Sequence, residues 1–285
     1  MVILMIKAIA TDLDGTLFYP RKKVRLISNA NKQFIQNVLK EGKEVILVTG
    51  RNYSIANKVE QAIGMTKSIS IVACNGAVIM HQGEMLKEDY ISGKEALELY
   101  YEIYDKRPDI KTWMFFTSEQ FMIVEPSGLN PIEKVAGVFG LNLQGAYYEP
   151  YILGKKKMVE YLSREDTKVY KIMPWFGYRS HSKILARDAT AEWIEKYGDK
   201  YNFAWAVDAV EISKKGIDKA SALKQLLKEL NINEDEVAVV GDSGNDVSLF
   251  KSFKNSFVMN QAAPEVKKEA KQVVNSVSDL ANYIK

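Results

Sequence analysis

At both ends of this 285-residue chain, short apolar runs alternate with segments in which apolar residues recur at helical spacing. The runs are typical of buried strands and the spaced segments of helices. Because parallel strands need crossover helices, this alternation indicates an α/β fold with a Rossmann-like, doubly wound parallel sheet. The expected strands are Ile6–Thr11, Glu44–Val48, Ile69–Ala73, Val237–Val240 and Phe257–Met259. The expected helices contain the stripes Phe34–Leu39, Ile55–Ile63, Ala220–Leu230, Val247–Phe250 and Ser278–Ile284.

Polar residues and glycines mark where the first two of these helices begin and end. Ser28 is a plausible N-terminal cap for the first helix, and Gly42 is expected to stop it. Gly64 is expected to end the second helix.

The middle of the chain differs in composition from its two ends. All 4 Trp and 12 of the 15 Tyr lie between Glu84 and Asp208. The shift predicts an inserted α+β domain at 84–208, with a first domain built from 1–83 and 209–285. The helices expected in this domain are Ala96–Tyr104, Ile132–Phe139 and Ala189–Tyr197. The strands expected in it are Thr112–Phe116, Phe121–Val124, Val169–Met173 and Phe203–Val207.

Composition excludes several classes of protein. With 47% apolar and 26% charged residues, the chain is typical of a folded globular protein. The net charge of +3 gives no electrostatic case for nucleic acid, and no run reaches the roughly 20 apolar residues of a membrane span. Met1–Ile6 lacks the features of a secretory signal. The single cysteine, Cys74, excludes a disulfide framework and fits a cytoplasmic location.

Small, polar or acidic residues follow four of the expected core strands. They are Thr11–Thr16, Thr49–Arg51, Asn75-Gly76 and Gly241–Asp246. Ligands of parallel α/β sheets bind at the carboxyl ends of the strands, so these residues are expected to converge on one site.

Two of the four segments carry pairs of aspartates. Asp12 and Asp14 stand two residues apart, which places both carboxylates on one side of an extended chain. If the fold brings Asp242 and Asp246 beside this first pair, the four carboxylates repel one another unless a cation lies between them. Oxygen ligands select a hard cation, and a site shared with a phosphate favours Mg²⁺. The alternatives are a solvated turn for the first pair and a helix N-terminal residue for Asp246.

Thr49, Gly50 and Lys219 are weaker signals when each is taken alone. Thr49 offers a hydroxyl at a strand end and Gly50 allows close backbone approach. Lys219 stands early in a helix starting near Ile217, where a cation is unfavourable unless it has an anionic partner. A solvated lysine is the alternative interpretation.

Taken in order, these segments resemble a known family. Asp12–Leu17, Thr49–Arg51, Lys219 and Gly241–Asp246 are similar to the four motifs of haloacid dehalogenase-like phosphatases. Asn75-Gly76-Ala77 and the large insertion after it resemble the Cof-type branch, which carries an α/β cap. The resemblance spans nearly the whole chain.

The resemblance implies a hydrolase that acts on small phosphate monoesters, with sugar phosphates as the default substrate. Asp12 is then the nucleophile that forms an aspartyl-phosphate, and Asp14 the general acid and base. Mg²⁺ is expected on the Asp12 carboxylate, the Asp14 carbonyl and Asp242. Asp246 is expected to orient Lys219. The phosphoryl oxygens are expected on the side chains of Thr49, Lys219 and Asn245 and on the backbone N–H groups of Leu13 and Gly50.

The sequence departs from the family pattern at three places. Asn52 stands where proline is common, Ala220 where glycine is common, and Met259–Ala262 replaces a usual Gly-Asn-Ala. None of these changes removes an expected catalytic group, but they leave loop geometry and substrate contacts open.

Other functions are weighed against the phosphatase. A phosphosugar mutase shares the same core and differs in passing the phosphoryl group to a second hydroxyl. A phospho-receiver domain also uses an Asp, a Thr and a Lys around Mg²⁺, but Asp14 and the long insertion argue against this function. A ligand-binding protein without catalytic activity is the third alternative, and the full set of acids argues against it. His81 and His181 are in no serine or cysteine triad arrangement and no zinc motif, and their roles stay open. The specific ester and the oligomeric state stay open.

Overall fold

The chain divides into two compact units in the computed structural model, which describes residues 5–18, 27–65, 68–134 and 150–284. Unit 1 is Met1–Glu88 with Asp218–Lys285, and unit 2 is Asp89–Ile217. These limits lie a few residues beyond Gly83 and Asp208, where the composition shift placed them. The reason is strand pairing: Glu84–Glu88 pairs inside unit 1, and Ala209–Lys214 pairs inside unit 2.

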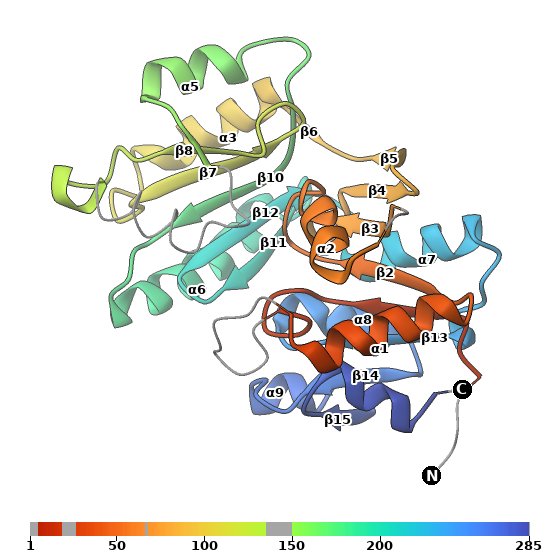
Figure 1. Cartoon of the computed structure of the whole chain (residues 1–285). Helices are drawn as coiled ribbons and strands as arrows, with labels where there is room; N and C mark the ends of the chain where they lie inside the picture. The colour runs from red at the N-terminus through yellow and green to blue at the C-terminus, as the bar shows by residue number, and fades with distance from the viewer. Residues whose placement is uncertain (1–4, 19–26, 66–67, 135–149, 285) are drawn as a thin grey trace. The chain divides into compact units, whose positions relative to one another are not determined.

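Unit 1 is built on one mixed sheet (Figure 1). Among the described residues it has eight strands in the order β15-β14-β13-β1-β2-β3-β4-β5. Strands β1, β2, β3, β13, β14 and β15 pair in parallel, and β4 and β5 extend the edge in antiparallel pairing. The bounds are β1 Ala8–Thr11, β2 Glu44–Val48, β3 Ser70–Ala73, β4 Val78–His81, β5 Glu84–Glu88, β13 Val237–Gly241, β14 Ser256–Met259 and β15 Gln272–Val274. The predicted Rossmann-like α/β fold is confirmed, whereas β4, β5 and β15 were not expected.

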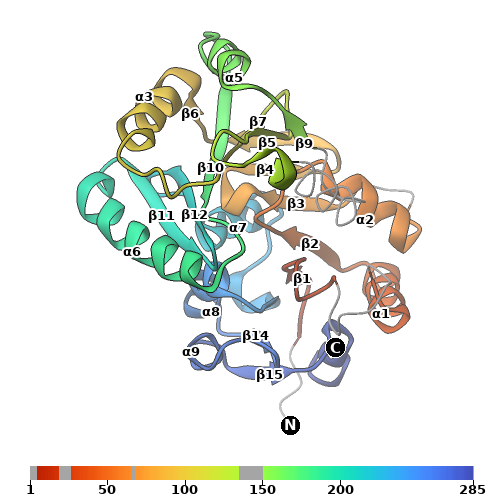
Figure 2. The same ribbon diagram turned by 90° about the vertical axis from the view of Figure 1, so that its left-hand side faces the viewer.

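Helices cover both faces of this sheet (Figure 2). Helices α1 and α2 lie on one face, and α7 and α8 lie on the other. Leu223 and Leu226 of α7 and Phe250 of α8 share a buried cluster with Ala8 and Ala10 of β1, so alternate residues of β1 face these helices. The bounds are α1 Asn29–Lys40, α2 Ile55–Ile63, α7 Lys219–Glu229, α8 Val247–Ser252 and α9 Pro264–Lys267, with short 3₁₀ helices at Cys74–Gly76, Glu234–Glu236, Gly244–Asp246 and Val277–Asn282.

The predicted ends of α1 and α2 are confirmed in detail. The Ser28 hydroxyl accepts a hydrogen bond from the Asn31 N–H at 3.1 Å, as an N-cap does. Gly64 adopts the left-handed conformation with φ 79° and closes α2, and Gly42 follows the end of α1 with φ 75°.

The closing helix predicted at Ser278–Ile284 is present, but it lies at Val277–Asn282 and is a 3₁₀ helix and not an α-helix. Local side chains hold the tighter turn. Asp279 accepts from the N–H groups of Asn275 and Ser276 at 2.9 and 3.1 Å, and Asn31 accepts from the N–H of Ser278 at 3.0 Å. Such side-chain bonds to the backbone compete with a regular α-helix.

Unit 2 carries its own sheet and its own core. Among the described residues its strand order is β11-β12-β10-β7-β8-β9, with β6 paired to β10. Helices α3, α5 and α6 contribute to one buried cluster with this sheet, in which Trp113 and Trp193 are almost fully buried. The bounds are β6 Ile91–Ser92, α3 Gly93–Tyr104, β7 Thr112–Thr117, β8 Met122–Glu125, β9 Pro150–Ile152, α5 Lys155–Leu162, β10 Lys168–Trp175, α6 Ser180–Tyr197, β11 Tyr201–Ala206 and β12 Ala209–Lys214.

The predicted elements of unit 2 are present with different limits. Helix α6 begins at Ser180, well before the expected Ala189, and β6, β9, β12 and α5 were not expected. The helix predicted at Ile132–Phe139 starts within residues 131–134, and its remainder lies outside the described residues. No helix in the part of the chain that the structure describes is both long and apolar enough to cross a membrane.

The strand order of unit 1 decides where a ligand can bind. Strands β2 and β3 lie to one side of β1, and β13, β14 and β15 lie to the other. The direction of winding therefore reverses between β1 and β13. Parallel sheets bind their ligands at the carboxyl ends of the strands beside such a reversal.

Candidate active site

The loop after β1 places two aspartates beside the end of β13. The Asp12 N–H donates to the Val240 carbonyl at 2.9 Å, so Asp12 still follows the sheet. Gly15 then turns the chain with φ 77°, and a Cβ built there would lie 2.2 Å from Asp242 Oδ2. Only glycine fits this turn, because a side chain would collide with the carboxylate on the neighbouring strand end.

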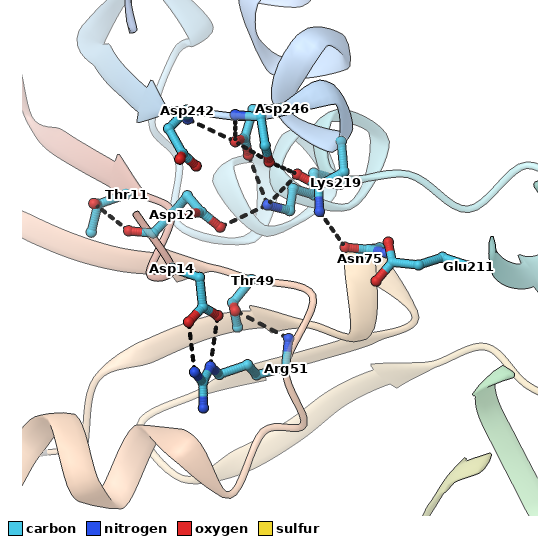
Figure 3. A network of polar contacts seen from close by, with 12 residues as sticks. Thr11, Asp12, Asp14, Thr49, Arg51, Asn75, Glu211, Lys219, Asp242 and Asp246 are labelled. Carbon is cyan, nitrogen blue, oxygen red and sulfur yellow. Dashed lines mark hydrogen bonds and ion pairs between the residues drawn. The ribbon is translucent and has the colours of Figure 1, made fainter. Parts of the chain in front are cut away.

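Lys219 lies at the centre of the polar network (Figure 3). Its Nζ donates to Asp12 Oδ1 at 2.8 Å, to Asp246 Oδ1 at 2.7 Å and to Asn245 Oδ1 at 3.3 Å. The Lys219 side chain is fully buried. An ammonium group so far from water needs anionic partners, and the alternative of a solvated lysine is wrong.

Asp246 uses both of its carboxylate oxygens in this network. Oδ1 accepts from Lys219, while Oδ2 accepts from the backbone N–H groups of Asp242 and Ser243 at 3.0 and 3.1 Å. Asp246 therefore fixes the loop after β13 and orients Lys219 at the same time.

Burial and like charges determine the protonation of these acids. Burial raises the pKa of Asp12 well above its usual range, although Lys219 opposes the shift, and the Asp246 charge raises it further. Burial, followed by the Asp246 charge, raises the pKa of Asp242 to about 7. Burial disfavours the Lys219 ammonium, but the charges of Asp12 and Asp246 outweigh it and raise the Lys219 pKa. With Asp12, Asp242 and Asp246 all ionised, the site would carry more negative charge than Lys219 balances, and the raised pKa values of Asp12 and Asp242 reflect this.

The same acids form a group that could hold a metal ion. One oxygen from each of Asp12, Asp242 and Asp246 lies within 4.8 Å of the others. Asp242 Oδ1 is buried and accepts no hydrogen bond from any described residue. A buried carboxylate oxygen without a partner is costly unless a cation binds it. Oxygen-only ligands of this kind suit a hard divalent cation, so the residues fit such an ion.

The other predicted phosphate ligands lie on neighbouring loops. Thr49 and Gly50 directly follow β2, and the Thr49 hydroxyl accepts from the Arg51 N–H at 3.1 Å. Leu13 lies between Asp12 and Asp14, and its carbonyl accepts from the N–H of Phe18 at 2.7 Å. Asn245 contacts Lys219 and lies in the short helix Gly244–Asp246.

The Asp14 carboxylate does not join the acidic group. It is half exposed and is held by Arg51, whose Nε and Nη2 donate to Asp14 Oδ2 and Oδ1 at 2.6 Å each. Figure 3 shows the Asp14 side chain directed toward Arg51, whereas the Asp12 side chain is directed toward Lys219.

Three contacts at this edge were not expected from the sequence. Arg51 pairs with Asp14; Asn75 accepts from the Asn245 amide at 3.4 Å; and the Gln261 amide donates to the Gly15 carbonyl. Arg51 and Asn75 belong to the strand-end segments that the sequence analysis identified. Gln261 belongs to Met259–Ala262, the segment that departs from the family pattern. No sequence pattern indicated the partners of these three residues.

The two histidines take no part in the contacts just described. His81 Nδ1 and the Ser70 hydroxyl are 2.8 Å apart at the β3–β4 pair of unit 1. His181 is exposed on α6 of unit 2.

Comparison with known proteins agrees with this arrangement. The family model for haloacid dehalogenase-like hydrolases matches residues 9–284. The chain belongs to this family. The resemblance that the motifs indicated is confirmed, and so is the predicted enzyme class, a hydrolase.

Relatives of similar length support the family over the whole chain. The phosphatase YwpJ of Bacillus subtilis is 24% identical, with 98% of this chain and 99% of that protein covered. A haloacid dehalogenase-like hydrolase from B. subtilis has the same fold, with TM-score 0.80, 22% identity and 98% and 99% of the chains covered. A further one from Bacteroides thetaiotaomicron has TM-score 0.74 at 22% identity, over 97% and 98% of the chains.

Proposed function

We propose that this hydrolase is a Mg²⁺-dependent phosphatase that cleaves small phosphate monoesters, sugar phosphates by default, through an aspartyl-phosphate on Asp12. The observation that carries the proposal is the buried Asp12 carboxylate at the end of β1, bonded to Lys219 and grouped with Asp242 and Asp246. A relative of similar length bears the name phosphatase, which supports the same assignment.

The two steps use Asp12 and Asp14 in different roles. An Asp12 carboxylate oxygen attacks phosphorus, a P–O bond forms, and the bond from phosphorus to the ester oxygen breaks. Asp14 gives a proton to that departing oxygen. Water then attacks the aspartyl-phosphate, Asp14 takes a proton from the water, and the Asp12 carboxylate is restored with release of phosphate.

Positioning of the phosphoryl group falls to donors around Asp12. Lys219 lies 2.8 Å from Asp12 Oδ1, close enough to contact an oxygen of a phosphoryl group bound to that side chain. The hydroxyl of Thr49, the amide of Asn245 and the backbone N–H groups of Leu13 and Gly50 complete the proposed set. Phosphoryl transfer depends mainly on such positioning and on charge stabilisation.

The Asp12 carboxylate, the Asp14 carbonyl and Asp242 are the proposed ligands of Mg²⁺. When bound there, the ion supplies positive charge that lets one anion approach another. Asp246 stays a positioning residue in this assignment, because Lys219 and two backbone N–H groups already occupy its oxygens.

Unit 2 is the proposed cap of the enzyme, with unit 1 as its catalytic core. In this proposal the cap determines which leaving group the enzyme accepts, and a cytoplasmic small-molecule ester is the expected substrate.

Phosphate release from a panel of esters, with Mg²⁺ supplied, tests the proposal. Asp12→Asn removes the nucleophile and is expected to abolish turnover, while Asp235→Asn, an exposed aspartate, serves as the matched control. Phosphate release by Asp12→Asn above a trace would overturn the nucleophile assignment. Turnover that appears only with a bisphosphate activator would point to a phosphosugar mutase instead.

A further inference from the structure

Arg51 forms a bidentate salt bridge, called the fork below, with the proposed acid–base residue Asp14. Its Nε and Nη2 reach the two oxygens of the same carboxylate at 2.6 Å each (Figure 3). Planar guanidinium and carboxylate groups joined by two parallel bonds fix each other's orientation, which a single ammonium group does not achieve. The contact therefore restrains the direction of the Asp14 carboxylate.

Arg51 is anchored through both its backbone and its side chain. The backbone N–H donates to the Thr49 hydroxyl at 3.1 Å, and the backbone carbonyl accepts from the Cys74 N–H at 2.8 Å. The guanidinium carbon lies 5.8 Å from the centroid of the Phe18 ring. The side chain is mostly buried, whereas that of Asp14 is about half exposed. The arginine is thus the fixed partner, and the aspartate is the group that it holds.

The two acids of the first loop have separate cationic partners. Lys219 contacts Asp12 and Asp246, and Arg51 contacts Asp14. Among the described residues, the Asp14 carboxylate is also outside the group of carboxylates that could hold a metal ion. Arg51 therefore takes no part in the contacts that join Lys219 to Asp12 and Asp246.

We propose that Arg51 is a positioning residue that sets the orientation from which Asp14 exchanges protons with the leaving oxygen. The inference rests on the proposed function and deepens it. When the bond from phosphorus to the ester oxygen breaks, its electron pair stays on that oxygen, which takes the proton from Asp14. Arg51 gains and loses no proton, and in this proposal it acts on the reaction through Asp14.

Proton donation matters most for esters whose alcohol leaves poorly. An alkyl ester needs the proton in the transition state, whereas the p-nitrophenolate ion leaves readily without one. A residue that positions the acid should therefore affect alkyl esters more than p-nitrophenyl phosphate. A residue that binds the phosphoryl group should affect both equally, since that group is the same in both.

The test compares the two ester types in Arg51→Gln. The substrates are p-nitrophenyl phosphate and the alkyl phosphate that the wild-type enzyme cleaves best. We expect kcat/KM for the alkyl ester to fall at least about tenfold more than for the aryl ester, since general acid catalysis contributes 10²- to 10⁴-fold. Asp14→Asn should show the same split. The double variant should be no slower than Asp14→Asn alone, because Arg51 acts through Asp14.

Further variants keep the test decisive. Arg51→Lys retains the charge without the fork and should show the same split to a smaller degree. Arg187→Gln removes an exposed arginine that pairs with its neighbour Asp188, and should behave as wild type. Thermal unfolding of each variant checks that it is folded.

Several results would overturn the inference. They are equal losses on the two esters, multiplied losses in the double variant, a gain in activity for Arg51→Gln, or full activity of Arg51→Lys on both esters. Failure of the proposed function is a different result, in which wild-type enzyme releases phosphate from neither ester or Asp12→Asn keeps its activity.

Discussion

Lys219 links three side chains of the site through one buried ammonium group. It contacts Asp12, Asn245 and Asp246, which come from the ends of two different strands. In the proposed reaction the same group faces the phosphoryl oxygens when negative charge builds up on them. A buried donor acts strongly on such charge because little water competes for it.

Lys219→Met is expected to raise the activation barrier by about 3 kcal/mol, on the order of a hundredfold in kcat, because one charge-stabilising donor is lost. Steady-state phosphate release measures the effect. Lys224→Met, on the solvent side of the same helix, is the control and should keep wild-type kcat. A change of less than threefold in Lys219→Met would contradict a direct role for the ammonium.

The raised pKa of Asp242 leads us to expect that the affinity of the site for Mg²⁺ depends on pH. Burial and then Asp246 raise its pKa to about 7, so without the ion its carboxyl group is partly protonated near neutrality. A metal ion binds the carboxylate and must displace the proton, so the apparent affinity should increase as the pH rises through about 7. Titration calorimetry at pH 6 and pH 8 measures this difference. Equal affinities at the two pH values would contradict it, and Asp242→Asn should bind weakly at both.

At the scale of the elements, α7 carries Lys219 in its first turn. A positive charge is unfavourable near a helix N-terminus, and the first N–H groups of a helix lack partners within it. Asp218 compensates as the N-cap, because its side chain accepts from the N–H groups of Ala220 and Ser221 at 2.8 and 3.0 Å. The capping bonds of Asp218 therefore offset the unfavourable position of Lys219 in the first turn of α7.

Asp218→Ala is expected to lower the free energy of unfolding by about 1 kcal/mol, because the capping bonds and a favourable charge are lost. Denaturant unfolding measures the loss. Asp218→Asn keeps an acceptor in the same place and should cost less. If the two variants lose the same stability, the cap does not stabilise the helix as argued.

At the scale of the whole molecule, each unit has a buried core of its own. All 4 Trp lie in unit 2, whereas the acidic group that could hold a metal ion lies in unit 1. Tryptophan fluorescence therefore comes from side chains of unit 2, whereas the acidic group that a metal ion could bind belongs to unit 1.

Mg²⁺ is expected to raise the unfolding temperature of unit 1 and to leave the tryptophan-detected transition nearly unchanged. Binding to the folded state alone stabilises that state in proportion to the logarithm of ligand concentration. Calorimetry and fluorescence, each with Mg²⁺ and with a chelator, compare the two units. If both signals shift together, the two units unfold as one.

Local patterns along the chain were sufficient for much of the fold. The stripe Ile55–Ile63 with Gly64 after it gave α2 its observed limits, and the apolar run Glu44–Val48 gave β2. The polar strand β5, with the sequence Glu-Met-Leu-Lys-Glu, carried no such pattern, because an edge strand needs few buried side chains. Its existence depends on pairing with β4.

The same distinction holds for the site. The order of residues along the chain is enough to show which groups stand at the strand ends, because apolar runs, glycines and acids follow one another in an order that local sterics and burial already specify. The contacts of Lys219 with Asp12 and Asp246, and of Asp14 with Arg51, are visible in the folded chain and not in the order of its residues. These partners are far apart in sequence, and the direction of a charged side chain at a strand end is determined by whichever opposite charge the neighbouring strands bring to it.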